Sequence, residues 1–126
     1  MDIKKSRAKK DEAAFVFRKY ARLGLDRTVL KPFEAYETIR GVSPSENDAL
    51  KLLAVYDMVR LLEYTDPEAI GAVRAVYFFD RGKTPQRAQT SYRVLRYASD
   101  NNCDERTVYR RLRIAKELYY HLAVNL

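Results

Sequence analysis

Apolar residues recur along most of this chain at the three- and four-residue spacing of an α-helix that buries one face. Short breaks separate these repeats, and no pair of segments shows the alternation of apolar and polar residues that predicts β-strands. The fold class that we predict is therefore all-α, with about six helices. Their expected ranges are 11–23, 32–40, 44–64, 67–81, 85–100 and 105–124.

Proline, glycine and capping residues mark the expected helix ends. Ser43 and Glu46 are three residues apart with Pro44 between them, which predicts a capping box and a proline at the first helical position. Gly24 and Gly41 are expected to end the first two helices, because glycine readily adopts the conformation that follows many helices. The other expected starts are Asp66–Pro67, or a capping box of Thr65 with Glu68, and Thr84–Pro85, with Gly82 as a further stop.

The apolar stripe of each helix predicts which side packs into the core. In the first helix this side consists of Ala14, Phe15, Phe17 and Ala21, and in the fifth of Ala88, Ser91, Leu95 and Ala98. In the last helix, a turn of 100° per residue brings together within about 80° of arc Val108, Leu112, Ala115, Tyr119 and Leu122. Its opposite side carries Arg106, Tyr109, Arg110, Arg113, Glu117 and Tyr120, and Arg111 lies near the edge of the buried side.

The composition fits a soluble globular domain. The 126 residues are 47% hydrophobic and 33% charged, and no apolar run is long enough to span a membrane. The N-terminus is basic but lacks the apolar segment of a secretory signal. Cys103 is the only cysteine, which excludes an internal disulfide framework and suits a reducing cytoplasm. We therefore expect a cytoplasmic protein that has no membrane partner.

The net charge of +7 is concentrated at the two ends of the chain. Residues 1–10 hold five Lys and Arg against one Asp, and residues 81–126 hold ten against four acidic residues. Residues 11–80 hold nine against twelve, so the middle is mildly acidic. This asymmetry favours a polyanionic partner, most often nucleic acid. The basic segment 1–10 is expected to be a mobile tail, which either reaches the DNA backbone or only aids solubility.

The sequence offers no set of residues that predicts catalysis. His121 is the only histidine, so the chain has no zinc cluster and no nucleophile paired with a histidine. The four glycines are not clustered, which argues against a phosphate-binding loop. Cys103 is expected to pack as a small apolar residue. We therefore expect no enzyme, no metal and no cofactor.

The segment before the last helix has the spacing of a helix-turn-helix. In this motif a small residue on the first helix is followed four positions on by a turn residue that tolerates a left-handed backbone, and six further on by a buried aliphatic residue. Ala98, Asn102 and Val108 fill these positions. Asp104 is expected to cap the second helix. Arginines at 106, 110, 111 and 113 then crowd its first turns, where the helix dipole disfavours cations.

This C-terminal pattern resembles the recognition helix of the sigma-70 region 4 type of helix-turn-helix. The residues that carry the resemblance are Asp104, Thr107, Val108, Leu112 and Ala115, within "DERTVYRRLRIAKELY". The segment "TVYRRLRIA" is also similar to a segment found in small phage-encoded transcriptional regulators of the ArpU/RinA type. The resemblance covers residues 66–124, whereas residues 1–65 match no part of a sigma factor. The expected domains are therefore a tail (1–10), a helical region with core and dimer surface (11–65) and the helix-turn-helix region (66–126).

The resemblance implies a DNA-binding transcriptional regulator of phage or prophage type, working on double-stranded DNA. The residues that it places toward the major groove are Arg106, Tyr109, Arg110 and Arg113, with Thr107 and Arg111 available to the backbone. The first helix of the motif and the segment before it add four candidate phosphate contacts, Lys83, Arg87, Arg93 and Arg96. Tyr120 is a further candidate for phosphate or sugar contact. The alternatives are a protein-interaction module, with RNA polymerase as a candidate partner, and a phage packaging or structural protein.

Overall fold

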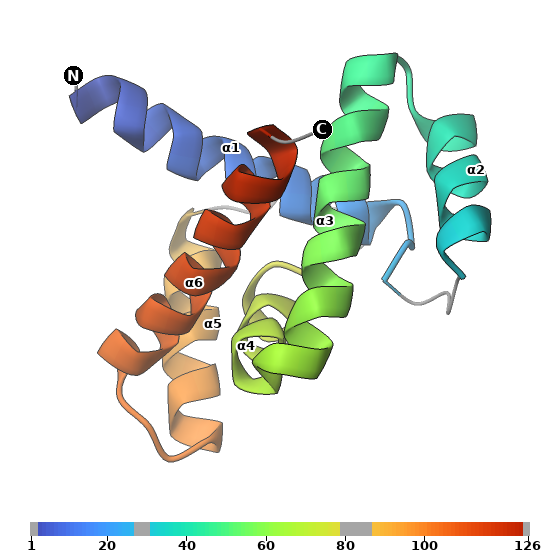
Figure 1. The fold of residues 1–126 in the computed structure, drawn as a ribbon. Helices are drawn as coiled ribbons and strands as arrows, with labels where there is room; N and C mark the ends of the chain where they lie inside the picture. The colour runs from blue at the N-terminus through green and yellow to red at the C-terminus, as the bar shows by residue number, and fades with distance from the viewer. Residues whose placement is uncertain (1–2, 27–30, 79–86, 125–126) are drawn as a thin grey trace.

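The computed structural model describes residues 3–26, 31–78 and 87–124, and all regular structure in these ranges is helical (Figure 1). The prediction of an all-α fold with about six helices is confirmed. The helices are α1 (Ile3–Arg22), α2 (Pro32–Val42), α3 (Glu46–Thr65), α4 (Pro67–Val76), α5 (Arg87–Asp100) and α6 (Glu105–Val124). No helix in these ranges is both long and apolar enough to cross a bilayer.

Helix α6 is the element that organises the fold, because it packs against α1, α3, α4 and α5. Helix α2 has a different place: of the described helices it packs only against α3, and it lies at the edge of the molecule (Figure 1). One apolar cluster nevertheless includes buried residues of all six helices. The N-terminal helices and the α5–α6 pair therefore share a single core.

An aromatic group at the centre of the core joins the first helix to the last. The Phe17 ring is fully buried and contacts the Tyr119 ring edge-to-face, with the ring centroids 5.6 Å apart. It also contacts the Tyr77 ring, at a centroid distance of 5.9 Å. Edge-to-face ring contacts of this kind add about 0.5–1.5 kcal/mol each to the stabilisation that comes from burying the rings.

Gly71 helps α5 to approach α4, since a side chain there would come within 3.1 Å of the Tyr97 hydroxyl.

Two of the expected helix ends are confirmed. Gly24 has a φ of 76°, and the N–H groups of Gly24 and Leu25 donate back to α1 in the pattern of a Schellman motif. Asp66 caps α4 by accepting a hydrogen bond from the Ala69 N–H at 3.2 Å, and Pro67 is the first helical residue.

The expected boundary between the second and third helices is wrong. Helix α2 continues through Gly41 to Val42, and the Ser43 hydroxyl donates to the Ile39 carbonyl instead of capping α3. Ser45 is the cap of α3, and accepts a hydrogen bond from the Asp48 N–H at 3.2 Å. Glu46 pairs with Arg40 at 2.8 Å, so it does not close the predicted capping box with Ser43.

Three further expectations about the helices need correction. Helix α1 begins at Ile3 instead of near residue 11, and α4 ends at Val76 instead of near residue 81. Phe15 and Leu95, expected in the core, are 61% and 54% exposed. Val94 is fully buried instead of Leu95, because α5 is rotated so that Val94 and Ala98 share the buried face while Ser91 is exposed. The expected cap Thr84, Pro85 and the stop at Gly82 lie outside the described residues.

Candidate nucleic-acid interface

The turn between α5 and α6 has the geometry that the sequence predicted. Asn102 has a φ of 51°, the only positive φ among the described residues other than glycine. The Cys103 N–H donates to the Ala98 carbonyl at 3.0 Å, and the Asn102 N–H donates to the Ser99 carbonyl at 3.3 Å. These two bonds form a Schellman motif, which ends α5 and turns the chain toward α6. Cys103 packs against the core as expected.

Asp104 caps the N-terminus of α6. Its Oδ1 accepts a hydrogen bond from the Thr107 N–H at 2.8 Å. This bond is the main reason that the pKa of Asp104 lies below its ordinary value, and the Thr107 hydroxyl and the charges of Arg106 and Arg110 lower it as well. The capping carboxylate is therefore charged at neutral pH and lies among cations, which fixes where α6 begins.

Substitutions at Asn102 test the left-handed turn. We expect Asn102→Gly to keep or slightly raise stability, because glycine has no steric penalty at positive φ. Asn102→Val should lower the free energy of unfolding by about 1–2 kcal/mol, since a left-handed backbone crowds a Cβ and a β-branched side chain most of all. Urea unfolding followed by circular dichroism measures both variants. Equal stability of the two would show that the turn is not left-handed in solution.

The buried stripe predicted for the last helix is confirmed. Val108, Leu112, Ala115 and Tyr119 are each no more than 2% exposed, and Leu122 is half-buried at the end of the stripe. These side chains belong to the core cluster that the six helices share, and the Tyr119 ring contacts Phe17 of α1. The rotation of α6 about its own axis is thereby fixed. The arginine side must then face away from the core.

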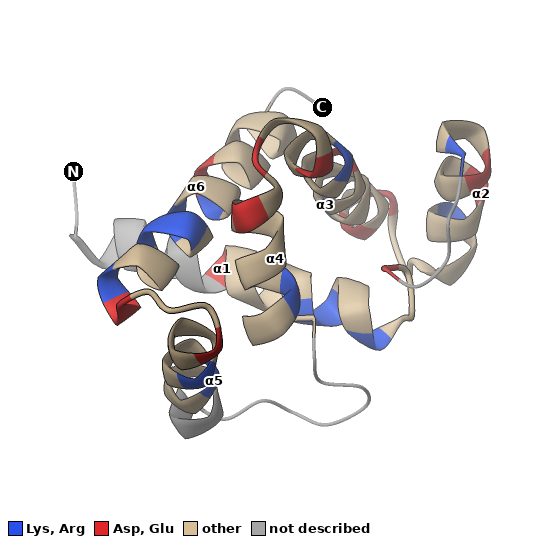
Figure 2. Ribbon diagram, turned by 90° about the horizontal axis from the view of Figure 1, so that it is seen from below, with Lys and Arg blue, Asp and Glu red and all other residues tan. Residues whose placement is uncertain are grey.

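The four predicted base-facing residues lie together on the outer side of α6. Arg106, Arg110 and Arg113 are exposed, and Tyr109 is 47% exposed. They occupy positions i, i+3, i+4 and i+7 and therefore form one row along the first half of the helix. In Figure 2, the blue of Lys and Arg recurs along the part of α6 that follows the turn from α5. Within the described part of the chain, none of these three arginines has a hydrogen-bond or ion-pair partner. Three guanidinium groups are thus left available on one helical face.

The residues predicted to contact the DNA backbone differ from one another in exposure and in their partners within the protein. Arg111 is only 19% exposed and pairs with Glu68 of α4 at 3.0 Å, so its main contact is within the protein. Arg96 is exposed, with Asp100 at 3.9 Å, whereas Arg93 and Thr107 are half-buried. Lys83 and the side chain of Arg87 lie outside the described residues. Arg96 is therefore the described residue of α5 that is best placed to meet a phosphate.

One predicted contact is wrong, and two cations were missed. Tyr120 does not face outward: its hydroxyl accepts a hydrogen bond from the Ala13 N–H at 3.1 Å, because α1 crosses this end of α6. Lys116 and Arg18 both approach the Tyr77 ring, at 5.0 Å and 5.2 Å from its centroid. Lys116 follows Arg113 by one helical turn, but it is half-buried over the Tyr77 ring and so is not part of the exposed row.

Comparison of the chain with family models, with curated proteins and with solved structures finds no match in any of the three. The geometry of the site consists of a left-handed turn, a capped helix, a buried stripe and an outward row of three arginines and a tyrosine.

Proposed function

We propose that the protein is a DNA-binding transcriptional regulator, of the type found in phages and prophages, that binds duplex DNA through α5 and α6 as a helix-turn-helix. The observation that carries the proposal is the row of Arg106, Arg110 and Arg113, which extends from a helix whose opposite face is locked into the core. An α-helix fits the major groove, and a free guanidinium can bond to both the O6 and N7 acceptors of guanine. Such a protein works in the cytoplasm, at the nucleoid.

The two helices of the proposed helix-turn-helix, α5 and α6, have distinct roles in DNA binding. Arg110 and Arg113 are the residues that we assign to guanine edges, with Arg106 and Tyr109 beside them on the same face. Arg96 of α5 contacts a phosphate and so sets the register of α6 in the groove. Lys83, Arg87, Arg93, Thr107 and Arg111 are proposed as further backbone contacts, of which Arg111 would first have to leave Glu68.

A single arginine substitution tests the base contact. The preferred DNA site would first be selected from random duplexes, and binding of Arg110→Ala would then be measured by fluorescence anisotropy. We expect a loss of about 1–3 kcal/mol on the selected site and a weaker preference at one base position. Arg40→Ala on α2 removes the same charge away from α6 and is the matched control. Unchanged affinity and preference in Arg110→Ala would place Arg110 away from the bases.

A second candidate function, protein binding, is favoured by the outer surface of α2 and α3. Phe33 and Tyr64 are 74% and 92% exposed, and Tyr36 and Leu61 are each 43% exposed. An open groove at this surface is lined by Pro32 of α2, by Tyr56, Leu61 and Tyr64 of α3, and by Leu122 of α6. We propose a second copy of the chain as the first partner to test for this surface. RNA polymerase, or a partner in phage packaging, remains the alternative.

The oligomeric state distinguishes these uses of the α2–α3 surface. If the surface pairs two copies, Phe33→Glu and Tyr64→Glu should each convert a dimer to a monomer in sedimentation velocity, because a charge would be buried at the contact. Phe15→Glu changes a similarly exposed aromatic residue on α1 and serves as the control. A wild-type protein that stays monomeric at about 100 µM, well above the micromolar Kd of a weak interface, would rule out the homodimer.

A further inference from the structure

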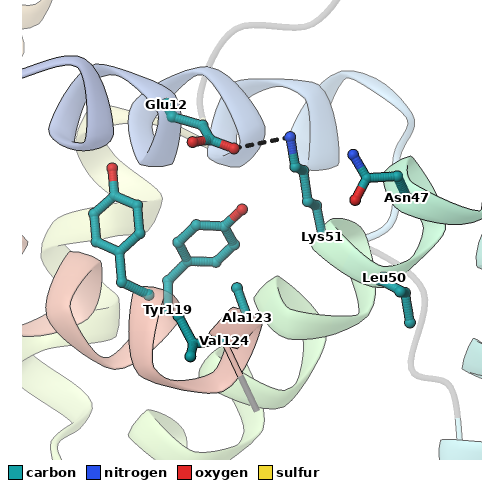
Figure 3. A pocket seen from close by; sticks show the side chains of 8 residues that line it. Glu12, Asn47, Leu50, Lys51, Tyr119, Ala123 and Val124 are labelled. Atoms are coloured by element: carbon teal, nitrogen blue, oxygen red, sulfur yellow. Dashed lines mark ion pairs between the residues drawn. The ribbon is translucent and has the colours of Figure 1, made fainter. Parts of the chain in front are cut away.

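A pocket of about 370 Å³ lies on the opposite half of α6 from the arginine row, where α6 meets α1 and α3 (Figure 3). Its volume is at the lower end of the range typical of small-molecule sites. The lining residues are Glu12 of α1, Asn47, Leu50 and Lys51 of α3, and Tyr119, Tyr120, Ala123 and Val124 of α6. Neither the DNA-binding proposal nor the α2–α3 surface uses this pocket.

The polar wall of the pocket carries one positive and one negative group side by side. The Lys51 Nζ atom lies 2.8 Å from the Glu12 Oε1 atom (Figure 3). The two side chains are 34% and 41% exposed, so the pair is at the mouth of the pocket and is partly hydrated. Ion pairs at this exposure contribute little to stability, and a ligand can rearrange them at small cost.

Tyr119 supplies a hydrogen-bonding group that the protein leaves unused. The side chain is 1% exposed, yet its hydroxyl makes no hydrogen bond within the described part of the chain. Its neighbour Tyr120 differs, since the Tyr120 hydroxyl accepts from the Ala13 N–H. The buried side-chain atoms without a partner among the described residues do not include the Tyr119 oxygen, so this hydroxyl reaches the surface of the pocket that Tyr119 lines. An unused hydroxyl at the wall of a pocket is therefore available to a polar atom of a bound molecule.

The hydroxyl of Tyr119 is a donor at any physiological pH. Burial and then the negative charge of Glu12 raise the pKa of Tyr119 above its ordinary value, so the proton stays on the oxygen. A donor beside the Lys51 ammonium group favours an anionic oxygen on the ligand. Asn47 adds an amide that can donate or accept.

We propose that this pocket binds a free α-amino acid with an apolar side chain. Because Lys51 and Glu12 lie next to each other, the charges that complement them must also be neighbours, as the carboxylate and ammonium groups of an α-amino acid are. The ligand carboxylate meets Lys51 and the Tyr119 hydroxyl, and the ligand ammonium meets Glu12. The side chain of the ligand then packs on Leu50, Ala123 and Val124.

The charges of the pocket argue against other common ligands. A phosphate or a nucleotide would place two negative charges next to Glu12 with only Lys51 to balance them. A divalent cation would be repelled by Lys51, and no group of three or more potential metal ligands occurs within the described residues. The ligand that suits the pocket best has no net charge and carries one positive and one negative group close together.

Isothermal titration calorimetry on the full chain, with L-leucine, L-valine and L-phenylalanine as probes, tests the proposal. We expect binding of at least one probe, and at least about tenfold weaker binding of 4-methylpentanoate and 3-methylbutylamine, which each lack one of the two charges. NMR shift changes should be confined to the residues of the pocket. No binding of any probe up to 10 mM, a limit of roughly −3 kcal/mol, or equal binding of the compound that lacks the amine, would overturn the proposal.

Single substitutions distinguish a loss of ligand binding at this pocket from a general disturbance of the fold. Lys51→Met, Glu12→Gln and Tyr119→Phe should each weaken binding about tenfold or more. Tyr119→Phe removes only the unused hydroxyl, so it should fold at least as well as the natural chain. Lys19→Met is the matched control, because Lys19 pairs with Asp48 between the same two helices, outside the pocket. Equal loss in Lys19→Met, or no loss in Tyr119→Phe, would contradict the assigned contacts, whatever the DNA-binding experiments show.

Discussion

Val108→Asp should unfold the protein or leave it without cooperative structure. Val108 is fully buried in the core cluster that all six helices share, so the new carboxylate would have no water and no partner. We expect the free energy of unfolding to fall by at least about 4 kcal/mol, a large part of the 5–15 kcal/mol that holds a typical domain together. Circular dichroism and chemical denaturation measure this loss.

The neighbouring residue provides the control for this prediction. Tyr109→Asp adds the same charge one position further on, where the side chain is 47% exposed, and should change stability by less than about 1 kcal/mol. Tyr109→Asp should still weaken DNA binding, because it puts a negative charge on the proposed DNA-binding face. Equal stability of Val108→Asp and Tyr109→Asp would show that α6 does not have the orientation described above.

The triple variant Arg106→Gln, Arg110→Gln, Arg113→Gln should fold normally and lose DNA binding. These side chains are exposed and, among the described residues, have no ion-pair partner, so their loss takes no contact from the core. If each contributes about 1–3 kcal/mol on a specific site, affinity should fall by roughly 10²-fold or more. Fluorescence anisotropy on the selected duplex measures the change, and thermal unfolding checks the fold.

Net charge alone could weaken binding to a polyanion, so a charge-matched control is needed. The variant Arg22→Gln, Arg40→Gln, Arg60→Gln removes three exposed positive charges from α1, α2 and α3. It should keep most of the affinity, since the general field of the protein changes but the row on α6 stays intact. A similar loss of affinity in both triple variants would mean that DNA binding depends on the total charge of the protein and not on the arginine row of α6.

The features that could be predicted from the sequence are those set by local rules. Asn102, Asp104 and the buried stripe of α6 depend on backbone conformation, capping and helical periodicity, all of which act within a few residues. These predictions are confirmed. The arginine row follows from them, because fixing the buried side of a helix also fixes its exposed side.

The errors arose where contacts between distant segments decide the outcome. Leu95 and Val94 are both apolar, and only the packing of α5 against α4 and α6 determines which one is buried. Tyr120 is turned away from solvent by α1, which is distant in the sequence. The Glu12–Lys51 pair and the unused Tyr119 hydroxyl likewise come from three different helices, so no sequence motif signals the pocket.

The central claim is that the outer face of α6 binds duplex DNA, and a salt titration of the natural chain tests it most directly. Binding to a fluorescently labelled duplex would be measured at several salt concentrations between about 50 and 200 mM, a range over which phosphate contacts lose much of their strength. We predict that the logarithm of the binding constant falls linearly with the logarithm of salt concentration, by about 0.9 for each phosphate contact. Absence of binding at the lowest salt, or binding that salt does not change, would contradict the account.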